Sequence, residues 1–88
     1  SGPHQRYVAQ ARVLEALERE SAAQQALDHE KRVEALSGVT NLPAQRSAGE
    51  SLVSAQDDEH RWFSIYRQNG GEAANPQALT QAIKDPCG

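Results

Sequence analysis

The feature that most constrains the fold is a stretch of 34 residues, from His4 to Ser37, that contains neither glycine nor proline. It is rich in Ala, Leu, Glu, Gln and Arg, which are strong helix formers. As one helix it would be about 50 Å long, longer than a small globular domain is wide. Gly38 follows directly and predicts the end of the helix, with Val39 folding back on the last turn in a Schellman motif.

A second helix is predicted from its capping signals. Ser47 and Glu50 have the spacing of a capping box, which predicts a helix over residues 47–68. The Asn-Gly-Gly sequence of residues 69–71 is typical of a helix end. Because the linker over residues 38–46 is short, we expect the two helices to pack antiparallel.

A third, short helix is predicted over residues 76–84, because Asn75 is a good cap and Pro76 fits the first helical turn. Residues 1–3 resemble the remnant of a cleaved tag, which leaves one domain over residues 4–88. One alternative left open is that a signal sequence or membrane anchor preceded the chain. The expected fold class is all-α: a long helical hairpin of two antiparallel helices plus a short C-terminal helix.

The large apolar residues are few. Leu, Ile, Val and Phe make up 15 of the 88 residues, or about 17%, against the roughly 20% below which a chain struggles to build its own core. A core this thin is marginal in a small domain. We therefore expect self-association, or docking on a partner protein, to complete the burial.

The apolar spacing of the first helix indicates where copies would meet. A heptad pattern fails, but a spacing of eleven residues places Ala11, Ala22 and Val33 in one row. Alanines in the middle of the helix would let a neighbouring helix approach closely. The candidate self-association residues are Ala11, Leu14, Ala22, Ala26 and Val33.

Aromatic residues gather near the end of the second helix. They form an aromatic stripe that should lie beside residues 13–17 of the first helix. Two interpretations stay open: the aromatic residues form one end of the core, or some of them are exposed as an anchor for a partner. The candidate partner-binding residues are Trp62, Phe63, Tyr66 and Arg67.

The sequence contains little that would support catalysis or metal binding. Asp57 and His60 could share a helix face, and a hairpin folded about residue 42 would place His29 about one turn from His60. Carboxylate-bridged metal bundles need such a pair twice, so a solvated polar face is the better interpretation. Cys87 has no histidine near it in the sequence and is interpreted as a free thiol on the tail. We expect no enzyme activity, metal or cofactor.

Charge indicates the class of partner. The net charge of −3 and the pI near 5.5 argue against nucleic acid or an anionic membrane as the target, and the sequence contains no transmembrane run. We expect a protein partner, either further copies of the chain or a heterologous protein.

The sequence therefore favours a non-catalytic scaffold or adaptor in a bacterial assembly, in the periplasm or associated with the envelope rather than cytoplasmic. Arginine- and alanine-rich composition suggests the bacterial source. Two alternatives stay open: an inhibitor or immunity-type binder that uses the aromatic residues, and a small-ligand sensor with a pocket near Trp62.

About sixteen residues, from Leu52 to Arg67, resemble the segment around a Trp and a Tyr-Arg pair in the small helical, secreted lysozyme-inhibitor-like lipoproteins. The spacing from Gln56 to Trp62 is longer here, and the paired cysteines of that family are missing. The resemblance assigns no family.

Overall fold

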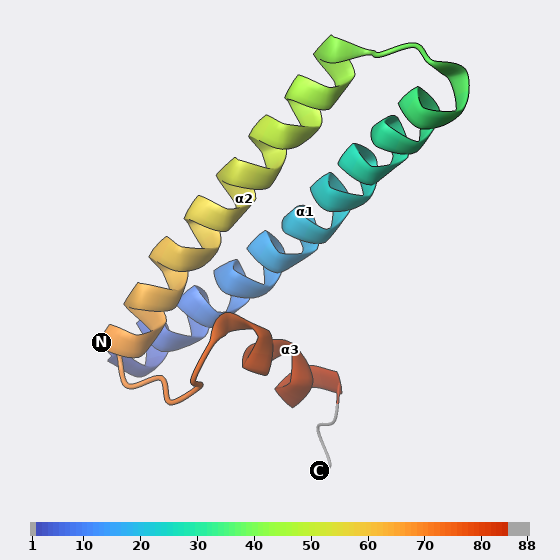
Figure 1. The fold of residues 1–88 in the computed structure, drawn as a ribbon. Coiled ribbons are helices and arrows are strands. Elements are labelled where there is room, and N and C mark those ends of the chain that lie inside the picture. The colour runs from blue at the N-terminus through green and yellow to red at the C-terminus, as the bar shows by residue number, and fades with distance from the viewer. Residues whose placement is uncertain (1, 85–88) are drawn as a thin grey trace.

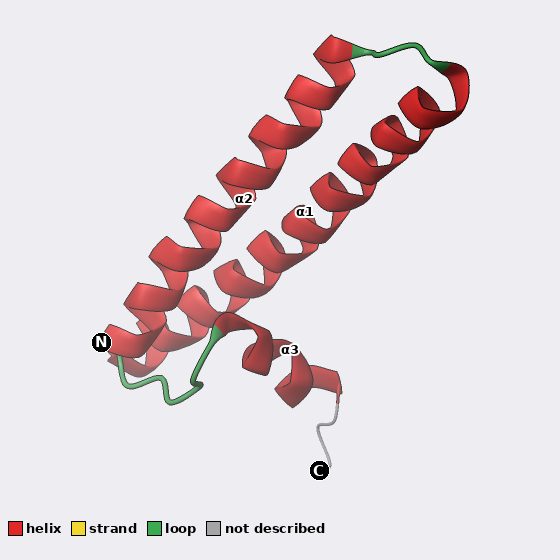
Figure 2. Ribbon diagram, in the orientation of Figure 1, coloured by secondary structure: helices red, strands yellow, loops and turns green. Residues whose placement is uncertain are grey.

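A computed structural model describes residues 2–84 of the chain. It contains three helices: α1 (Gly2–Ser37), α2 (Leu42–Gln68) and α3 (Pro76–Lys84). The two long helices run antiparallel side by side, and α3 lies beside the part of the hairpin that holds the N-terminus (Figure 1). Every described segment is either helix or loop, as Figure 2 shows. The all-α hairpin with a short third helix is confirmed.

The molecule is elongated. Its principal extents are 52 × 26 × 16 Å, and its radius of gyration is 16.3 Å, against about 12 Å for a compact domain of this length. The accessible surface of 6023 Å² also exceeds the about 5,100 Å² expected of a compact monomer of this mass. The hairpin therefore leaves more of its surface in water than a globular chain would.

The ends of α1 differ from the expectation in detail. The helix begins at Gly2, and Pro3 lies in its first turn, where a missing N–H does no harm. Gly38 adopts a φ of +73°, and its N–H donates to the carbonyl of Glu34 at 2.8 Å, so the glycine stop is confirmed. The predicted Schellman motif does not form at this end: the Val39 N–H donates to the Ser37 hydroxyl, and Val39 remains 68% exposed.

The start of α2 corrects the prediction. The helix begins at Leu42 rather than Ser47, because Asn41 is the cap: its side-chain oxygen accepts from the Ala44 N–H at 3.1 Å. Pro43 lies in the first turn of this helix, where proline is tolerated. Ser47 is an exposed residue inside the helix, so the predicted capping box does not form.

The predicted end of α2 is confirmed, and it carries the motif expected for α1. Gly70 has a φ of +91°. The Gly71 N–H donates to the Tyr66 carbonyl at 2.9 Å and the Gly70 N–H to the Arg67 carbonyl at 3.2 Å, which together make a Schellman motif. Gly71 packs so closely on the Tyr66 ring that a Cβ at this position would collide with it.

The start of α3 follows the prediction. The side-chain oxygen of Asn75 accepts from the Ala78 N–H at 3.0 Å, and Pro76 is the first helical residue. Leu79 turns inward to complete the core. Cys87 lies outside the described residues.

The core is concentrated at one end of the hairpin. Its buried cluster consists of Ala9, Val13, Tyr66 and Leu79, one or two residues from each helix. Toward the turn, over residues 23–54 (the turn half), the buried side chains are those of Ala23 and Ala48 alone. The two long helices therefore meet there through methyl groups.

Candidate interaction surfaces

The aromatic residues lie together at the core end, as the sequence predicts. The Phe63 and Tyr66 rings stack with their centroids 5.6 Å apart and an angle of 26° between their planes. Trp62 and Phe63 are half-buried against the core cluster, so each keeps part of its surface in water. Tyr7 on α1 is 67% exposed, with the Arg6 guanidinium 5.9 Å from its ring centroid.

Two of the four candidate partner-binding residues are engaged inside the molecule. Tyr66 is 7% exposed, and its hydroxyl accepts from the Ala73 N–H at 3.1 Å. Arg67 donates to the Ala73 carbonyl at 2.7 Å. Both contacts hold the segment between α2 and α3 against the hairpin. Of the four residues Tyr66 alone is buried: Trp62 and Phe63 are half-buried, and Arg67 is exposed.

Most of the candidate self-association residues are exposed. Ala11, Ala22 and Ala26 are exposed, and Val33 is 40% exposed. Leu14 is half-buried and packs against the core cluster, so its main contacts are internal. The eleven-residue row thus faces water along the length of α1.

Large aliphatic residues extend this exposed row at both ends. Val8 is 37% exposed and Leu36 is 89% exposed. Each lies one helical turn beyond the row, at a spacing of three residues that keeps it on the same side. We call this surface the outer face of α1; it comprises Val8, Ala11, Ala22, Ala26, Val33 and Leu36.

A groove of about 780 Å³ runs between α1 and α2 beside the outer face. Ala22 and Ala26 belong to both the groove and the outer face. The α2 wall is built mainly from small side chains, namely Ala44, Ser47, Ala48, Ser51 and Ser54. The walls of the groove consist mostly of alanine and serine side chains, which leave it open.

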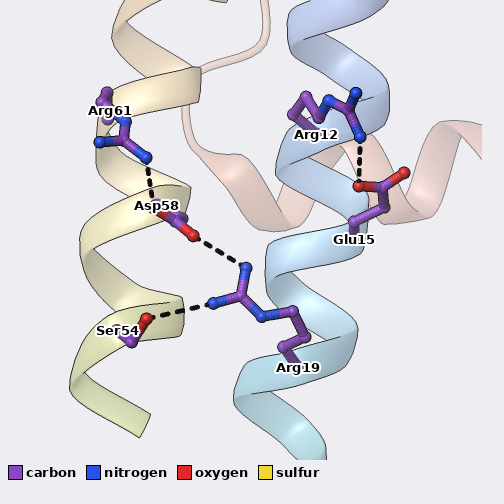
Figure 3. Close-up of polar contacts among 6 residues, drawn as sticks. All are labelled: Arg12, Glu15, Arg19, Ser54, Asp58 and Arg61. Carbon is purple, nitrogen blue, oxygen red and sulfur yellow. Dashed lines mark hydrogen bonds and ion pairs between the residues drawn. The ribbon is translucent and has the colours of Figure 1, made fainter. Parts of the chain in front are cut away.

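A polar bridge joins the long helices near their middle. The Arg19 guanidinium donates to Asp58 Oδ2 at 2.9 Å and to the Ser54 hydroxyl at 3.3 Å (Figure 3). Arg61, one turn along α2, donates to Asp58 Oδ1 at 2.5 Å. The hydrogen bond from Arg19 is the main cause that lowers the pKa of Asp58; partial desolvation opposes it, and the charges of Arg61 and Arg19 lower the pKa further.

Glu59 is a buried carboxylate beside this bridge. Its side chain is 4% exposed, and its Oε2 atom has no hydrogen-bond partner. Burial raises the pKa of Glu59, and the Glu20 carboxylate on α1 raises it further, while His60 and Gln77 act in the opposite direction. Glu59 lies four residues after Ala55, so the two share one side of α2. In the sequence, this spacing was the signal that Glu59 faces α1.

The predicted approach of His29 to His60 does not occur. The turn is centred near residue 40 rather than 42, and His29 lines the groove with Ala44 and Ala48. A turn centred near residue 40 sets His29 level with about residue 51, nine residues from His60, or about 14 Å along α2. Among residues 2–84, no three His, Cys, Asp or Glu side chains lie close enough to hold a metal ion.

Comparison of the chain with protein-family models, with curated proteins and with solved structures found no match. None of the helices over residues 2–84 has the length and apolar character needed to cross a membrane. The exposed surfaces of the molecule are therefore the basis for inferring its function.

Proposed function

We propose that this protein is a non-catalytic helical interaction module that serves as a scaffold or adaptor by associating with copies of itself through the outer face of α1. The exposure of this face is the observation that carries the proposal. Val8, Val33 and Leu36 are between 37% and 89% exposed, whereas the side chains of the core cluster are buried. Apolar side chains left exposed on one side of a helix can form a protein-binding site, and here Glu15, Glu18 and His29 lie between them on the same side.

The uneven core supports the proposal. In the turn half, the long helices bury only Ala23 and Ala48 between them. Small alanine contacts remove little apolar area from water, and burial stabilises by about 25 cal/mol per Å². A second copy on the outer face would cover the side chains of this half and add the burial that the single hairpin lacks.

The alternatives use the aromatic end. An inhibitor or immunity-type binder would anchor on Trp62 and Phe63, because Tyr66 and Arg67 already have internal contacts. A small-ligand sensor would need a pocket near Trp62, but the three grooves measured on the described chain have walls that do not include this residue. The bacterial and envelope-associated setting stays a prediction from the sequence.

The test is the solution mass of the protein, measured by light scattering on a sizing column over a concentration series under reducing conditions. We expect a dimer or larger species. Ala22→Lys places a charge in the centre of the outer face and should give a folded monomer. Val53→Lys is the matched control, because Val53 is 56% exposed on α2 and outside the outer face; it should leave the mass unchanged.

A native chain that is a well-folded monomer at every concentration would contradict self-association. Circular dichroism of both lysine variants separates loss of assembly from loss of fold. A monomer that binds a heterologous protein, with Trp62 fluorescence changing on binding, would favour the inhibitor-type alternative.

A further inference from the structure

We infer that two copies pair through their outer faces of α1 in antiparallel register, about a two-fold axis that passes beside Ala22. The inference rests on the proposed function and specifies the geometry of the self-association. It draws on the positions of the exposed residues, on their charges and on the shape of the molecule.

Four exposed apolar residues are placed symmetrically about Ala22, whereas Ala26 has Glu18 at the mirrored position. Ala11 and Val33 each lie eleven residues from it, and both are exposed. Val8 and Leu36 each lie fourteen residues from it, at the two ends of the outer face. An antiparallel pair therefore sets Val33 against Ala11 and Leu36 against Val8 of the second copy, so that a larger side chain meets a smaller one at each contact.

The polar side chains on the same face fit this direction, and two of them, Arg12 and Glu15, already form an ion pair within each copy at 2.9 Å. Glu15 is four residues after Ala11 and His29 is four residues before Val33, so the two lie opposite each other across an antiparallel pair. Arg12 and Glu30 are eighteen residues apart, or five helical turns, and share one flank of α1. The antiparallel arrangement brings Arg12 of one copy near Glu30 of the other, which is a favourable charge pair.

A parallel pair in register has the opposite electrostatic result. It would set Glu15 against Glu15, and like charges placed together across an interface are unfavourable. It would also set Ala11 against Ala11, leaving space that neither copy fills. The same residues therefore distinguish the two directions.

The centre of the outer face allows a close approach. Ala22 and Ala26 border the groove of about 780 Å³ between α1 and α2. Because the groove is lined mainly by small side chains, it can receive side chains from the α1 helix of the second copy. Close contact at the axis is possible where the residue on the axis is an alanine.

The shape of the molecule favours a contact along its length rather than at its tip. The cross-section of 26 × 16 Å offers an end surface of about 400 Å², against the roughly 800 Å² per partner that stable interfaces bury. The exposed Val39 and Leu42 at the turn are therefore too small a surface to hold two copies together alone. The 52 Å long side of the hairpin provides the larger area.

Disulfide cross-linking tests the register, in a chain whose own cysteine is removed by Cys87→Ser. Ala22→Cys lies at the axis and should cross-link with itself under mild oxidation. Ala11→Cys and Val33→Cys should each cross-link poorly alone, since equal residues lie about 33 Å apart along the paired helices. An equimolar mixture of the two should form the mixed dimer at least tenfold more than either variant alone.

Val53→Cys is the control for chance collisions between exposed thiols and should give only the background level. Self-cross-linking of Ala11→Cys would indicate a parallel pair and overturn the inference while leaving the proposed function intact. A dimer by light scattering that yields no cross-link at Ala22→Cys would also overturn the register. A monomer by light scattering would overturn the proposed function itself, and the inference with it.

Discussion

Glu59 is a charged residue that the fold holds in a buried position, where a charge is unfavourable. Its neighbours on α2 at helical spacing are apolar, so its side chain points toward α1 with them. There it meets Glu20, also a carboxylate, and one of its oxygens has no hydrogen-bond partner. An unpaired buried polar group destabilises a fold by about 1–3 kcal/mol.

We expect Glu59→Gln to stabilise the protein by about 1 kcal/mol at neutral pH, because it removes the buried charge and supplies a donor for Glu20. The raised pKa of Glu59 means that the neutral form favours folding. This stability is fully present below the ordinary pKa of 4.5 and is lost as the pH rises through the higher value of the folded state. Urea unfolding of both proteins between pH 4 and 7 measures the difference.

Glu50→Gln, at an exposed position on the same helix, is the control and should change the free energy of unfolding little. The contribution of Asp58 to stability changes with pH in the opposite direction. Its pKa lies below the ordinary 3.8, so its contribution is present above that pH and is lost as the pH falls through the lower folded value. A Glu59→Gln variant as pH-dependent as the native chain over pH 4–7 would show that Glu59 does not titrate with folding.

At the scale of the elements, the helices themselves were predictable and the start of α2 was not. Local composition decides where a helix can form, and Gly38, Gly70 and Asn75 mark boundaries that the structure confirms. The start of α2 had two competing signals, Asn41 before Pro43 and Ser47 before Glu50. Proline in a first turn is compatible with helix, so the earlier cap adds helical residues at little conformational cost.

The two caps can be told apart by substitution. Asn41→Ala removes the acceptor for the Ala44 N–H and should destabilise the protein by about 1 kcal/mol. Ser47→Ala should be neutral or slightly stabilising, because alanine is the better helix former inside a helix. Thermal unfolding of the two variants measures both effects. A larger loss for Ser47→Ala than for Asn41→Ala would place the start of α2 at Ser47 after all.

At the scale of the whole molecule, the small apolar content predicted a thin core, but its location depends on contacts far apart in the sequence. Leu79 joins Val13 and Tyr66 only because the segment after α2 turns back across the hairpin. The row Ala11, Ala22 and Val33 was identified from its spacing, and its exposure could be known only once α2 and α3 had been placed. The packing of Leu14 against the core likewise depends on where α2 and α3 lie.

Hydrogen exchange should reveal the uneven core. In dilute solution, we expect backbone amides of the turn half to exchange faster than those around Val13 and Tyr66, because local opening is easiest where little apolar surface is buried. Mass spectrometry of peptic fragments measures the rates. At high concentration, the middle of α1 should gain protection as copies associate. Equal protection along the hairpin in dilute solution would contradict the uneven core.

The alanine contact between α1 and α2 also affects how the long helices are aligned. Methyl groups form low ridges, so they offer little resistance to sliding of one helix along the other. Alignment along the axis therefore depends on polar contacts between the helices: Arg19 binds Asp58 near the middle, and Gln45 donates to Glu34 near the turn. Apolar burial at the aromatic end holds the two long helices together, whereas hydrogen bonds fix how far one helix is shifted along the other.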